Sequence, residues 1–521
     1  MKGIGNKDFY RYVIITVLAI SFYIALFSLL PDSRVVCSLS DDAYYYLQIS
    51  RNIALGNGST FDGINSTNGY HPLYLLILIP IHLLVNFNRL LAVRAIFILQ
   101  GALYFFTLYM VAKKLKSEVG VFGLLTMVVL TLYPRFFHIL TVGMESLLSL
   151  LLLSMIWFYS DGFFKGEGDL KGGFVLGILC GLLTLSRLEV GTVVTALLVL
   201  VILIVRFRKW GMRAISNALI IPLLYVIMVM PFLIWNYMVF NHILTISASL
   251  KSSYPNIVFN WRYILTYPEY YLGVLVFAIY LLYSGWRRRG GEVLRSLISD
   301  ALIGATCIVL LLSFLLFARW AHFSHYYAPC LLPIFILVAV AGDYTAGAFK
   351  RIFRPVAGRT IFISLLAIFA ISSQYIVHRD ALKTFKIASY EGAMWAKENT
   401  DKKAIFAMKD SGTFGYLSGR RTVNLDGVVN NFEYQEHLKQ GRLDDYLSNI
   451  GVDYIVQHAL WGCKRYVDVY GNETYELYLP SRLYAGYGDS LILREEDIVY
   501  KSSDYMDRSG NITNLAIWRY R

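Results

Sequence analysis

The chain has 521 residues, of which 57% are hydrophobic and only 16% are charged, and its formal net charge is +13. A soluble protein would carry about a quarter charged residues, so this composition excludes an ordinary soluble enzyme and indicates a membrane protein. The positive charge does not indicate nucleic-acid binding, because the Lys and Arg residues lie between the apolar runs.

Apolar runs near helix-spanning length predict eleven transmembrane helices. Dense basic clusters such as Lys113–Lys116 and Arg287–Arg289 fall in alternate loops. Because such clusters mark the cytoplasmic side, we expect a multi-pass protein of the cell (plasma) membrane with a cytoplasmic N-terminus and an extracytoplasmic C-terminal segment. The predicted spans lie at about 11–30, 90–112, 119–135, 144–160, 173–186, 190–206, 215–239, 269–285, 299–318, 327–345 and 359–377.

The run at 72–85 is predicted to be a juxtamembrane helix rather than a span. Its roughly fourteen residues are too few to cross a bilayer comfortably. Counting it as a span would also place the later basic clusters outside the cell. Residues 31–89 are therefore predicted to form the first extracytoplasmic loop.

Beyond about residue 378 the apolar runs shorten to strand length and alternate with helical stretches at 390–398 and 443–450. This pattern predicts a transmembrane domain over 1–378 and an extracytoplasmic α/β domain over 379–521. The five cysteines show no metal-binding spacing and no disulfide framework. The predicted strands lie at 404–408, 423–425, 454–456, 491–493 and 515–518.

Acids, cations and histidines gather in the loops predicted to lie outside. Carboxylates there could act as a base, and the cations could hold a negatively charged leaving group. Because no nucleotide sugar is expected outside the cytoplasm, a sugar carried on a lipid phosphate is the donor that suits this inventory. The candidates are Asp41, Asp42, His71, His138, Glu145, Arg187, Glu189, Arg319, His322, His325 and Tyr326.

Each candidate also has a structural interpretation. Asp41 and Asp42 follow Ser40 at a predicted helix start, where acids cap backbone N–H groups. His71 could cap the juxtamembrane helix, and the charged side chains could pair at the interface. Adjacent helical side chains diverge by about 100°, so only one acid is expected to face a substrate; Asp41 is predicted as the base and Asp42 as its support. No residue is predicted to bind a metal ion, but the sequence leaves open whether the protein uses a divalent cation as a cofactor.

Two segments of the first loop carry a family resemblance. The runs Asp41–Leu47 and Asn68–Leu73 resemble the first extracytoplasmic loop of GT-C fold glycosyltransferases, which use polyprenyl-phosphate-linked sugars. The similar branch contains arabinofuranosyltransferases, aminoarabinose transferases and protein O-mannosyltransferases. The resemblance implies a GT-C fold and a catalytic role for the first acid, Asp41. Further similar elements are Gly143–Ser146, Ser186–Glu189, His325–Pro329, Gly415–Arg420 and Asn424–Gly427.

The expected function is therefore an inverting transfer of one sugar from a polyprenyl phosphate to a hydroxyl group on a surface glycan, glycolipid or protein. A flippase or transporter of lipid-linked sugars is one alternative, and a glycan ligase or polymerase with a lipid-pyrophosphate donor is another. Oligosaccharyltransferases share the fold that the resemblance implies, but they carry a Trp-Trp-Asp element in the C-terminal domain. Only Trp461-Gly462-Cys463 appears in this sequence, so oligosaccharide transfer is disfavoured. Arg187, Arg319, His71, His322, His325 and Tyr326 are expected to bind the donor phosphate, with Glu145, Glu189 and His138 in support.

Overall fold

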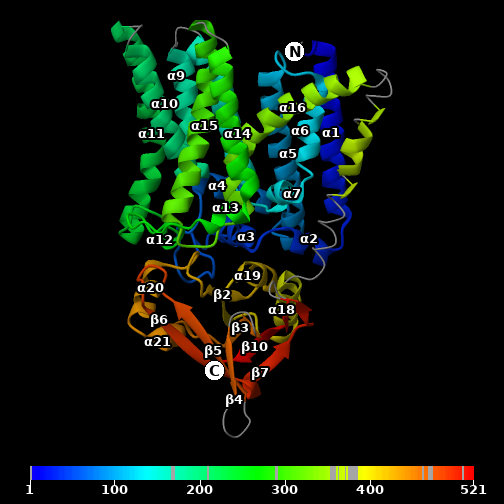
Figure 1. The fold of residues 1–521 in the computed structure, drawn as a ribbon. Coiled ribbons are helices and arrows are strands. Elements are labelled where there is room, and N and C mark those ends of the chain that lie inside the picture. Colours follow the sequence, from blue (N-terminus) through cyan, green and yellow to red (C-terminus); the bar gives the residue numbers. More distant parts are fainter. Residues whose placement is uncertain are drawn as a thin grey trace.

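The computed structural model describes residues 3–165, 170–207, 211–287, 291–352, 360–361, 363–369, 371–372, 385–459, 463–467, 473–506 and 510–520. The chain forms a bundle of long helices and a smaller domain of strands and helices, which lies against one end of the bundle (Figure 1). The N-terminus lies at the opposite end of the bundle. The predicted span 359–377 is described only in part, at 360–361, 363–369 and 371–372, where it is helical. Residues 460–462, which include Trp461, fall outside the described residues.

Six helices among the described residues are long and apolar enough to cross a membrane. They coincide with six predicted spans, and α14 (Pro268–Arg287) runs where a seventh was predicted. Two further predicted spans are the shorter helices α9 (Leu170–Ser186) and α10 (Leu188–Phe207). The six lie within α1 (Asn6–Leu29), α5 (Arg89–Leu115), α8 (Ser146–Lys165), α11 (Gly211–Phe240), α15 (Gly291–Phe317) and η1 (Ser324–Cys330) continuing into α16 (Leu331–Ile352).

The predicted span 119–135 is broken. Helix α6 (Val121–Leu130) ends before α7 (Pro134–Thr141), and the two axes differ by 76°. Pro134 occupies the first turn of α7, where its missing N–H costs nothing but where it also prevents α6 from continuing. The bend turns α7 toward the end of the bundle that meets the smaller domain (Figure 1).

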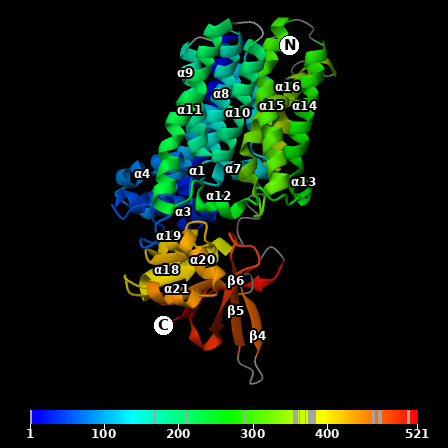
Figure 2. The ribbon, with the colours of Figure 1, turned by 90° about the vertical axis from the view of Figure 1, so that its left-hand side faces the viewer.

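Several short helices lie at this same end of the bundle. Helix α3 starts after Ser40, whose Oγ accepts a hydrogen bond from the backbone N–H of Ala43. Helix α4 lies beside α3 instead of running the length of the bundle (Figure 2). The short helices are α2 (Asp32–Ser38), α3 (Asp41–Ala54), α4 (Pro72–Leu84), α12 (Ile246–Lys251) and α13 (Arg262–Thr266).

The C-terminal part is an α/β domain. Its main sheet has the order β2-β1-β3-β10-β7, in which β2, β1 and β3 are parallel and β10 is antiparallel to both neighbours. A second sheet, β4-β5-β6, is antiparallel. The strands are β1 (Ile405–Met408), β2 (Arg421–Asn424), β3 (Tyr454–His458), β4 (Lys464–Val467), β5 (Glu473–Pro480), β6 (Gly488–Arg494), β7 (Ile498–Lys501), β8 (Tyr505–Met506), β9 (Ile512–Thr513) and β10 (Leu515–Arg519).

The five predicted strands overlap β1, β2, β3, β6 and β10, whereas β4, β5, β7, β8 and β9 were missed. In β5 the buried side chains of Tyr475, Leu477 and Leu479 alternate with polar or exposed ones, and this period-two signal is weak where aromatic and acidic residues mix. The helices of the domain are α18 (Phe385–Asn399), α19 (Gly412–Ser418), α20 (Phe432–Lys439), α21 (Leu443–Ile450) and η2 (Glu495–Asp497).

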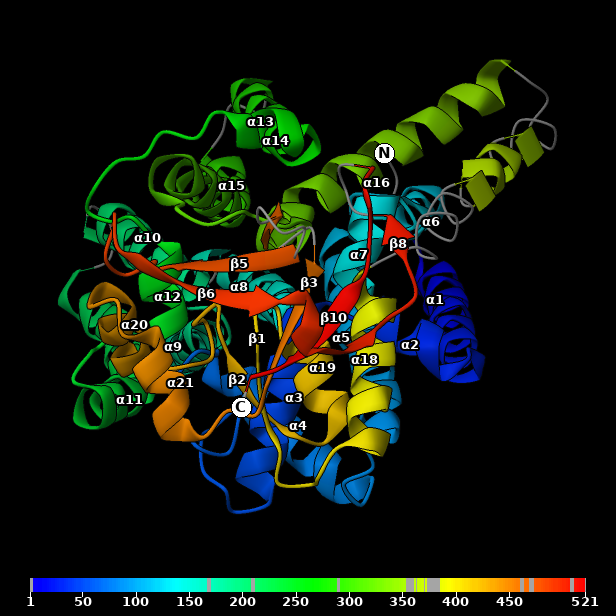
Figure 3. The same cartoon turned by 90° about the horizontal axis from the view of Figure 1, so that it is seen from below.

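Helix α19 packs against α3, so the C-terminal domain lies across the short helices (Figure 3). Polar contacts join the two parts, including hydrogen bonds from the Lys386 ammonium to the Leu39 carbonyl and from the Arg89 guanidinium to the Tyr416 carbonyl. Gly69 lies so close to the domain that a Cβ there would be 1.9 Å from the carbonyl oxygen of Val428. The first loop and the C-terminal domain therefore fit together without room for an added side chain.

We expect Gly69→Ala to push the C-terminal domain away from the first loop. The clash is with backbone, which cannot rotate aside as a side chain could, so we expect a loss of about 1–3 kcal/mol. A lower thermal unfolding midpoint and faster proteolysis of the C-terminal domain would show the effect. The control is Gly162→Ala, since a Cβ at Gly162 meets nothing within 4 Å. Equal behaviour of the two variants would contradict the observed packing.

Candidate active site

A cavity of about 310 Å³ lies where the loops of the bundle meet the C-terminal domain. Its walls come from segments far apart in the chain, including the start of α3, the loop before α4, the α9–α10 junction, α12 and the segment preceding α16. Val428 and Val429 of the C-terminal domain complete the lining. Eight of the eleven predicted candidates line this cavity: Asp42, His71, Glu145, Arg187, Glu189, His322, His325 and Tyr326.

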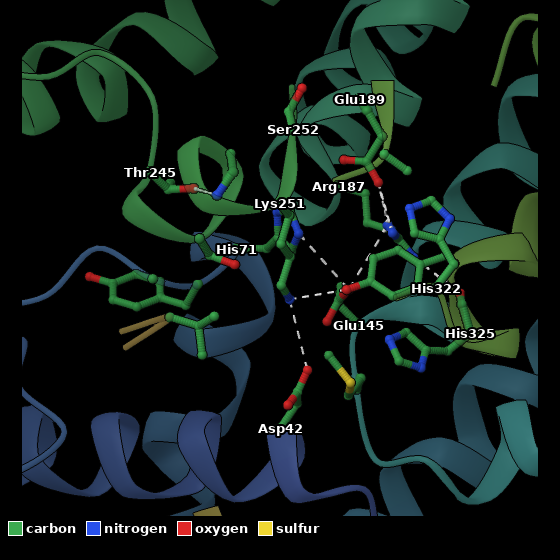
Figure 4. Close-up of a pocket in the computed structure, with 18 of the residues that line it drawn as sticks. Asp42, His71, Glu145, Arg187, Glu189, Thr245, Lys251, Ser252, His322 and His325 are labelled. Carbon is green, nitrogen blue, oxygen red and sulfur yellow. Dashed lines mark hydrogen bonds and ion pairs between the residues drawn. The ribbon is translucent and has the colours of Figure 1, made fainter. Parts of the chain in front are cut away.

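Asp42 and Lys251 face each other across the cavity (Figure 4). The Asp42 Oδ2 atom lies 3.9 Å from the Lys251 Nζ atom, and the carboxylate side chain is 32% exposed. Burial raises the pKa of Asp42, while the charge of Lys251 opposes the shift. This arrangement leaves a carboxylate that is accessible from the cavity and has a raised proton affinity.

Lys251 was not among the predicted site residues. Its ammonium group donates a hydrogen bond of 3.0 Å to the Tyr326 hydroxyl. Burial lowers the pKa of Lys251, but nearby Tyr326 and Asp42 outweigh it and raise the pKa overall, so the side chain stays charged. The sequence signal was weak: a single cation at the end of a six-residue helix, without a motif.

Arg187 occupies the junction between α9 and α10 and is almost completely buried. Its guanidinium donates to Glu189 Oε1 at 2.9 Å and to the backbone carbonyl of His325 at 3.1 Å. Glu145 Oε1 lies 3.9 Å from Arg187 Nε and 4.0 Å from His71 Nε2. The Arg187 guanidinium is therefore held in place by the carboxylates of Glu145 and Glu189 and by the backbone of the segment that contains His325.

The histidines of the cavity have unused hydrogen-bonding capacity. Neither ring nitrogen of His325, which is 3% exposed, has a hydrogen-bond partner in the described part of the chain. His325 and His322 both stack on the Tyr326 ring, with ring centroids 4.5 and 4.8 Å away. Burial lowers the pKa of His71, and it lowers that of His322 to about 3, so both are neutral at physiological pH. Buried polar atoms without partners are rare, and here they face a cavity that a polar ligand could fill.

Asp41 does not line the cavity. Its Oδ1 accepts hydrogen bonds from the backbone N–H and hydroxyl of Thr413, and its Oδ2 accepts one from the N–H of Gly412. The carboxylate therefore caps the N-terminus of α19 in the C-terminal domain, and it is only 9% exposed. The alternative interpretation of Asp41 was that it caps a helix, and its contacts are of this kind. The helix that it caps is α19, however, and not α3, in which Asp41 itself lies.

Arg319 and His138 also lie outside the cavity lining. Arg319 donates to the backbone carbonyl of Arg482 in the C-terminal domain, and His138 Nδ1 lies 2.9 Å from the Ser324 hydroxyl. Arg319 thus joins the start of the segment that carries His322, His325 and Tyr326 to the C-terminal domain, and His138 contacts the same segment at Ser324. In the residues that the structure describes, no group of three or more His, Cys, Asp or Glu side chains is arranged to hold a metal ion.

Two families match parts of the chain. Residues 70–235 match the family described as dolichyl-phosphate-mannose-protein mannosyltransferase. Residues 377–493 match a family described as a domain of unknown function. No curated protein matches the chain.

Solved structures share the fold at low sequence identity. The oligosaccharyltransferase AglB from Archaeoglobus fulgidus, in complex with an inhibitory peptide and a dolichol-phosphate, is 12% identical with a TM-score of 0.52, covering 89% of this chain and 76% of that chain. The apo form of the Archaeoglobus fulgidus oligosaccharyltransferase is 11% identical with a TM-score of 0.58, covering 95% and 80%. ArnT from Cupriavidus metallidurans, bound to undecaprenyl phosphate, is 12% identical with a TM-score of 0.55, covering 84% and 93%.

The predicted GT-C fold is thereby confirmed. The family match and the fold together bear out the predicted class, a membrane glycosyltransferase. The number of transmembrane helices and the side of the membrane on which the site lies stay predictions.

Asp41 should make the docking of the C-terminal domain depend on pH. Burial raises its pKa to about 6, although the hydrogen bonds from Thr413 and Gly412 oppose the shift. Because the folded protein then binds this proton more tightly than the unfolded chain, the stabilising contribution is lost as the pH rises from about 4 to about 6. We expect Asp41→Asn to flatten the change of the thermal unfolding midpoint over this interval, whereas the exposed Asp401→Asn should not. Identical pH profiles for wild type and Asp41→Asn would contradict this assignment.

Proposed function

We propose that the chain transfers a single sugar from a polyprenyl phosphate to an acceptor hydroxyl group, with inversion at the anomeric carbon, on the outer face of the cell membrane. The observation that carries the proposal is the division of charge in the cavity. Asp42 provides a carboxylate on one wall, and the remaining walls carry Lys251, the histidines, and Arg187 with its partners Glu145 and Glu189. This is the arrangement needed to accept a proton on one side of a sugar and to hold a phosphate on the other.

The reaction follows from these positions. The acceptor oxygen attacks the anomeric carbon and gives its proton to the Asp42 carboxylate. The bond between the anomeric carbon and the phosphate oxygen breaks, and the electron pair leaves with the lipid phosphate. Lys251 and Arg187 stabilise the negative charge that develops there, and the ring N–H groups of His71 and His325 can donate further hydrogen bonds.

The geometry favours Asp42 over Asp41 as the base. Asp42 lines the cavity, whereas both oxygens of Asp41 already accept hydrogen bonds from α19. Asp41 then has a positioning role, because it fixes the start of α3 against the C-terminal domain. The resemblance to GT-C enzymes favours the first acid, so the two assignments make opposite predictions for the two variants.

The size of the cavity suits a single sugar. Its volume of about 310 Å³ is at the lower end of the range for small-molecule sites, about 300–1,000 Å³. One sugar ring with its phosphate is a better fit than a preassembled oligosaccharide. A lipid-phosphate donor is also in keeping with the solved structures of the same fold, in which AglB holds a dolichol-phosphate and ArnT an undecaprenyl phosphate.

The proposed orientation rests on charge and on chain position. The described basic residues Lys113, Lys114 and Lys116 lie at the C-terminal end of α5, and the start of α5 contacts the C-terminal domain. Basic clusters favour the cytoplasmic side. The cavity and the C-terminal domain, at the opposite end, are then extracytoplasmic, where a glycan, glycolipid or protein acceptor would be available.

The central test is Asp42→Asn. We expect turnover to fall by about 10²–10⁴-fold, the usual contribution of a general base, with little change in folding. Turnover should be followed as polyprenyl phosphate released when candidate donors are supplied one at a time. Asp41→Asn should keep more activity than Asp42→Asn once folding is matched by thermal unfolding. Wild-type turnover in Asp42→Asn, with activity lost in a folded Asp41→Asn, would return the base to Asp41.

Lys251→Met should weaken donor binding more than acceptor binding. A charge-assisted hydrogen bond contributes about 1.5–3 kcal/mol, so the KM for the donor should rise by about 10- to 150-fold. Because Lys251 opposes the upward shift of the Asp42 pKa, the pH below which kcat/KM falls should also move upward. The exposed Lys402→Gln serves as the control. A rise confined to the KM for the acceptor would remove Lys251 from the phosphate site.

The same assay separates the alternatives. A ligase or polymerase with a lipid-pyrophosphate donor would release polyprenyl pyrophosphate, and a flippase would move the donor between leaflets without cleaving it. Release of the monophosphate together with a glycosylated acceptor is the outcome expected here.

A further inference from the structure

A second group of cations lies on the opposite face of α3 from the cavity. Arg51 follows Asp42 by nine residues, which is two and a half turns of an α-helix at about 3.6 residues per turn. Its side chain therefore points away from the cavity, toward α4 and the start of α5. There it meets the ring of Phe87 at 6.0 Å, and Arg89 lies over the ring of Tyr416 at 5.7 Å.

Among the described residues, these two guanidinium groups have no acidic partner. Neither Arg51 nor Arg89 forms a salt bridge with a carboxylate in the part of the chain that the structure describes. The Arg51 Nε atom is buried and has no hydrogen-bond partner there, and only the Nε atom of Arg89 donates, to the Tyr416 carbonyl. Arg420 nearby adds positive charge, although its own N–H groups are used by Thr400 and Lys397.

A buried histidine, His82, lies close enough to these arginines for their positive charge to affect its pKa. His82 is fully buried, and its Nε2 lies 3.0 Å from the Ser50 hydroxyl, while its Nδ1 has no partner among the described residues. Burial lowers the pKa of His82 to about 4, and the charges of Arg51 and Arg89 add to this shift. Within the part of the chain that the structure describes, the site is therefore positive and no carboxylate balances its charge.

Exposed leucines surround these arginines. Leu55 lies four residues after Arg51 and so on the same face of α3. The leucines Leu55, Leu83, Leu84 and Leu91, on α4, at the end of α3 and at the start of α5, are 42%, 57%, 85% and 50% exposed. Since α5 enters the predicted membrane span immediately after Arg89, this apolar surface lies at the level where acyl chains meet head groups.

We propose that Arg51 and Arg89 bind the phosphate of an anionic phospholipid, whose acyl chains lie against the exposed leucines of α4 and α5. Uncompensated arginines beside apolar surface at a membrane interface match both parts of such a lipid. This site is separate from the donor cavity and does not depend on the proposed transfer reaction. The lipid would lie beside α19, where Arg89 joins the bundle to the C-terminal domain.

The test is lipid binding by the full-length chain in detergent, measured by native mass spectrometry. Phosphatidylglycerol and phosphatidylcholine with the same acyl chains are the probes. We expect the wild type to retain phosphatidylglycerol preferentially, and Arg51→Gln to reduce this retention about fivefold. Arg51→Gln is the primary variant because its side chain holds no hydrogen bond within the described structure; adding Arg89→Gln should reduce retention further. The exposed Arg262→Gln at the same end of the bundle should bind as the wild type does.

Three results would overturn the proposal. The first is equal retention of phosphatidylglycerol by the wild type and Arg51→Gln. The second is loss of the preference when inorganic phosphate is added at modest concentration, because free phosphate would then be the ligand and not a lipid. The third is loss of retention in Lys251→Met but not in Arg51→Gln, which would place the lipid in the donor cavity.

Discussion

A buried guanidinium organises the cavity. Arg187 is removed from water, so its charge has to be balanced by partners that the fold brings to it. Those partners come from three places in the chain: Glu189 at the start of α10, Glu145 before α8, and the carbonyl of His325 before α16. Loss of one partner of such a buried pair costs about 3–5 kcal/mol. The loops that carry the site are thus held in one arrangement before a ligand enters, which is the condition for electrostatic catalysis.

Helix α3 connects this cavity to the rest of the molecule. Successive side chains on a helix point about 100° apart, so its first two acids serve different neighbours. Asp41 meets α19 of the C-terminal domain, and Asp42 meets Lys251 across the cavity. Two and a half turns later, Arg51 faces the opposite side. One helix of 14 residues therefore positions the proposed base, anchors a domain and presents the proposed lipid site.

The C-terminal domain contributes to the cavity as well as covering it. Val428 and Val429 form part of the lining, and the backbone of Val428 packs directly on Gly69. Tyr45, which also lines the cavity, donates a hydrogen bond to Asp426 of the domain. The walls of the cavity therefore come from both parts of the chain. Exclusion of water by such a cover strengthens every charge interaction inside it.

Much of this organisation could be predicted from the sequence, because it rests on local signals. Apolar runs and basic clusters placed the polar loops on one side of the predicted membrane, and eight of the eleven candidate residues do line one cavity. Strands with a strong apolar run, such as β1 and β10, were also predictable, whereas β5, with mixed aromatic and acidic residues, was not.

Only the tertiary structure decided which way the individual side chains point. Asp41 and Asp42 are equivalent in sequence, and they are distinguished by a contact between Asp41 and Thr413, 372 residues away. Lys251 belongs to no motif, and it enters the site because α12 brings its ammonium group to 3.9 Å from the Asp42 carboxylate and to 3.0 Å from the Tyr326 hydroxyl. Arg319 and His138 carry the right chemistry, but they contact Arg482 and Ser324 and do not line the cavity. The reason is physical: composition and periodicity determine the element and its depth, whereas packing between distant elements determines the rotation of each helix.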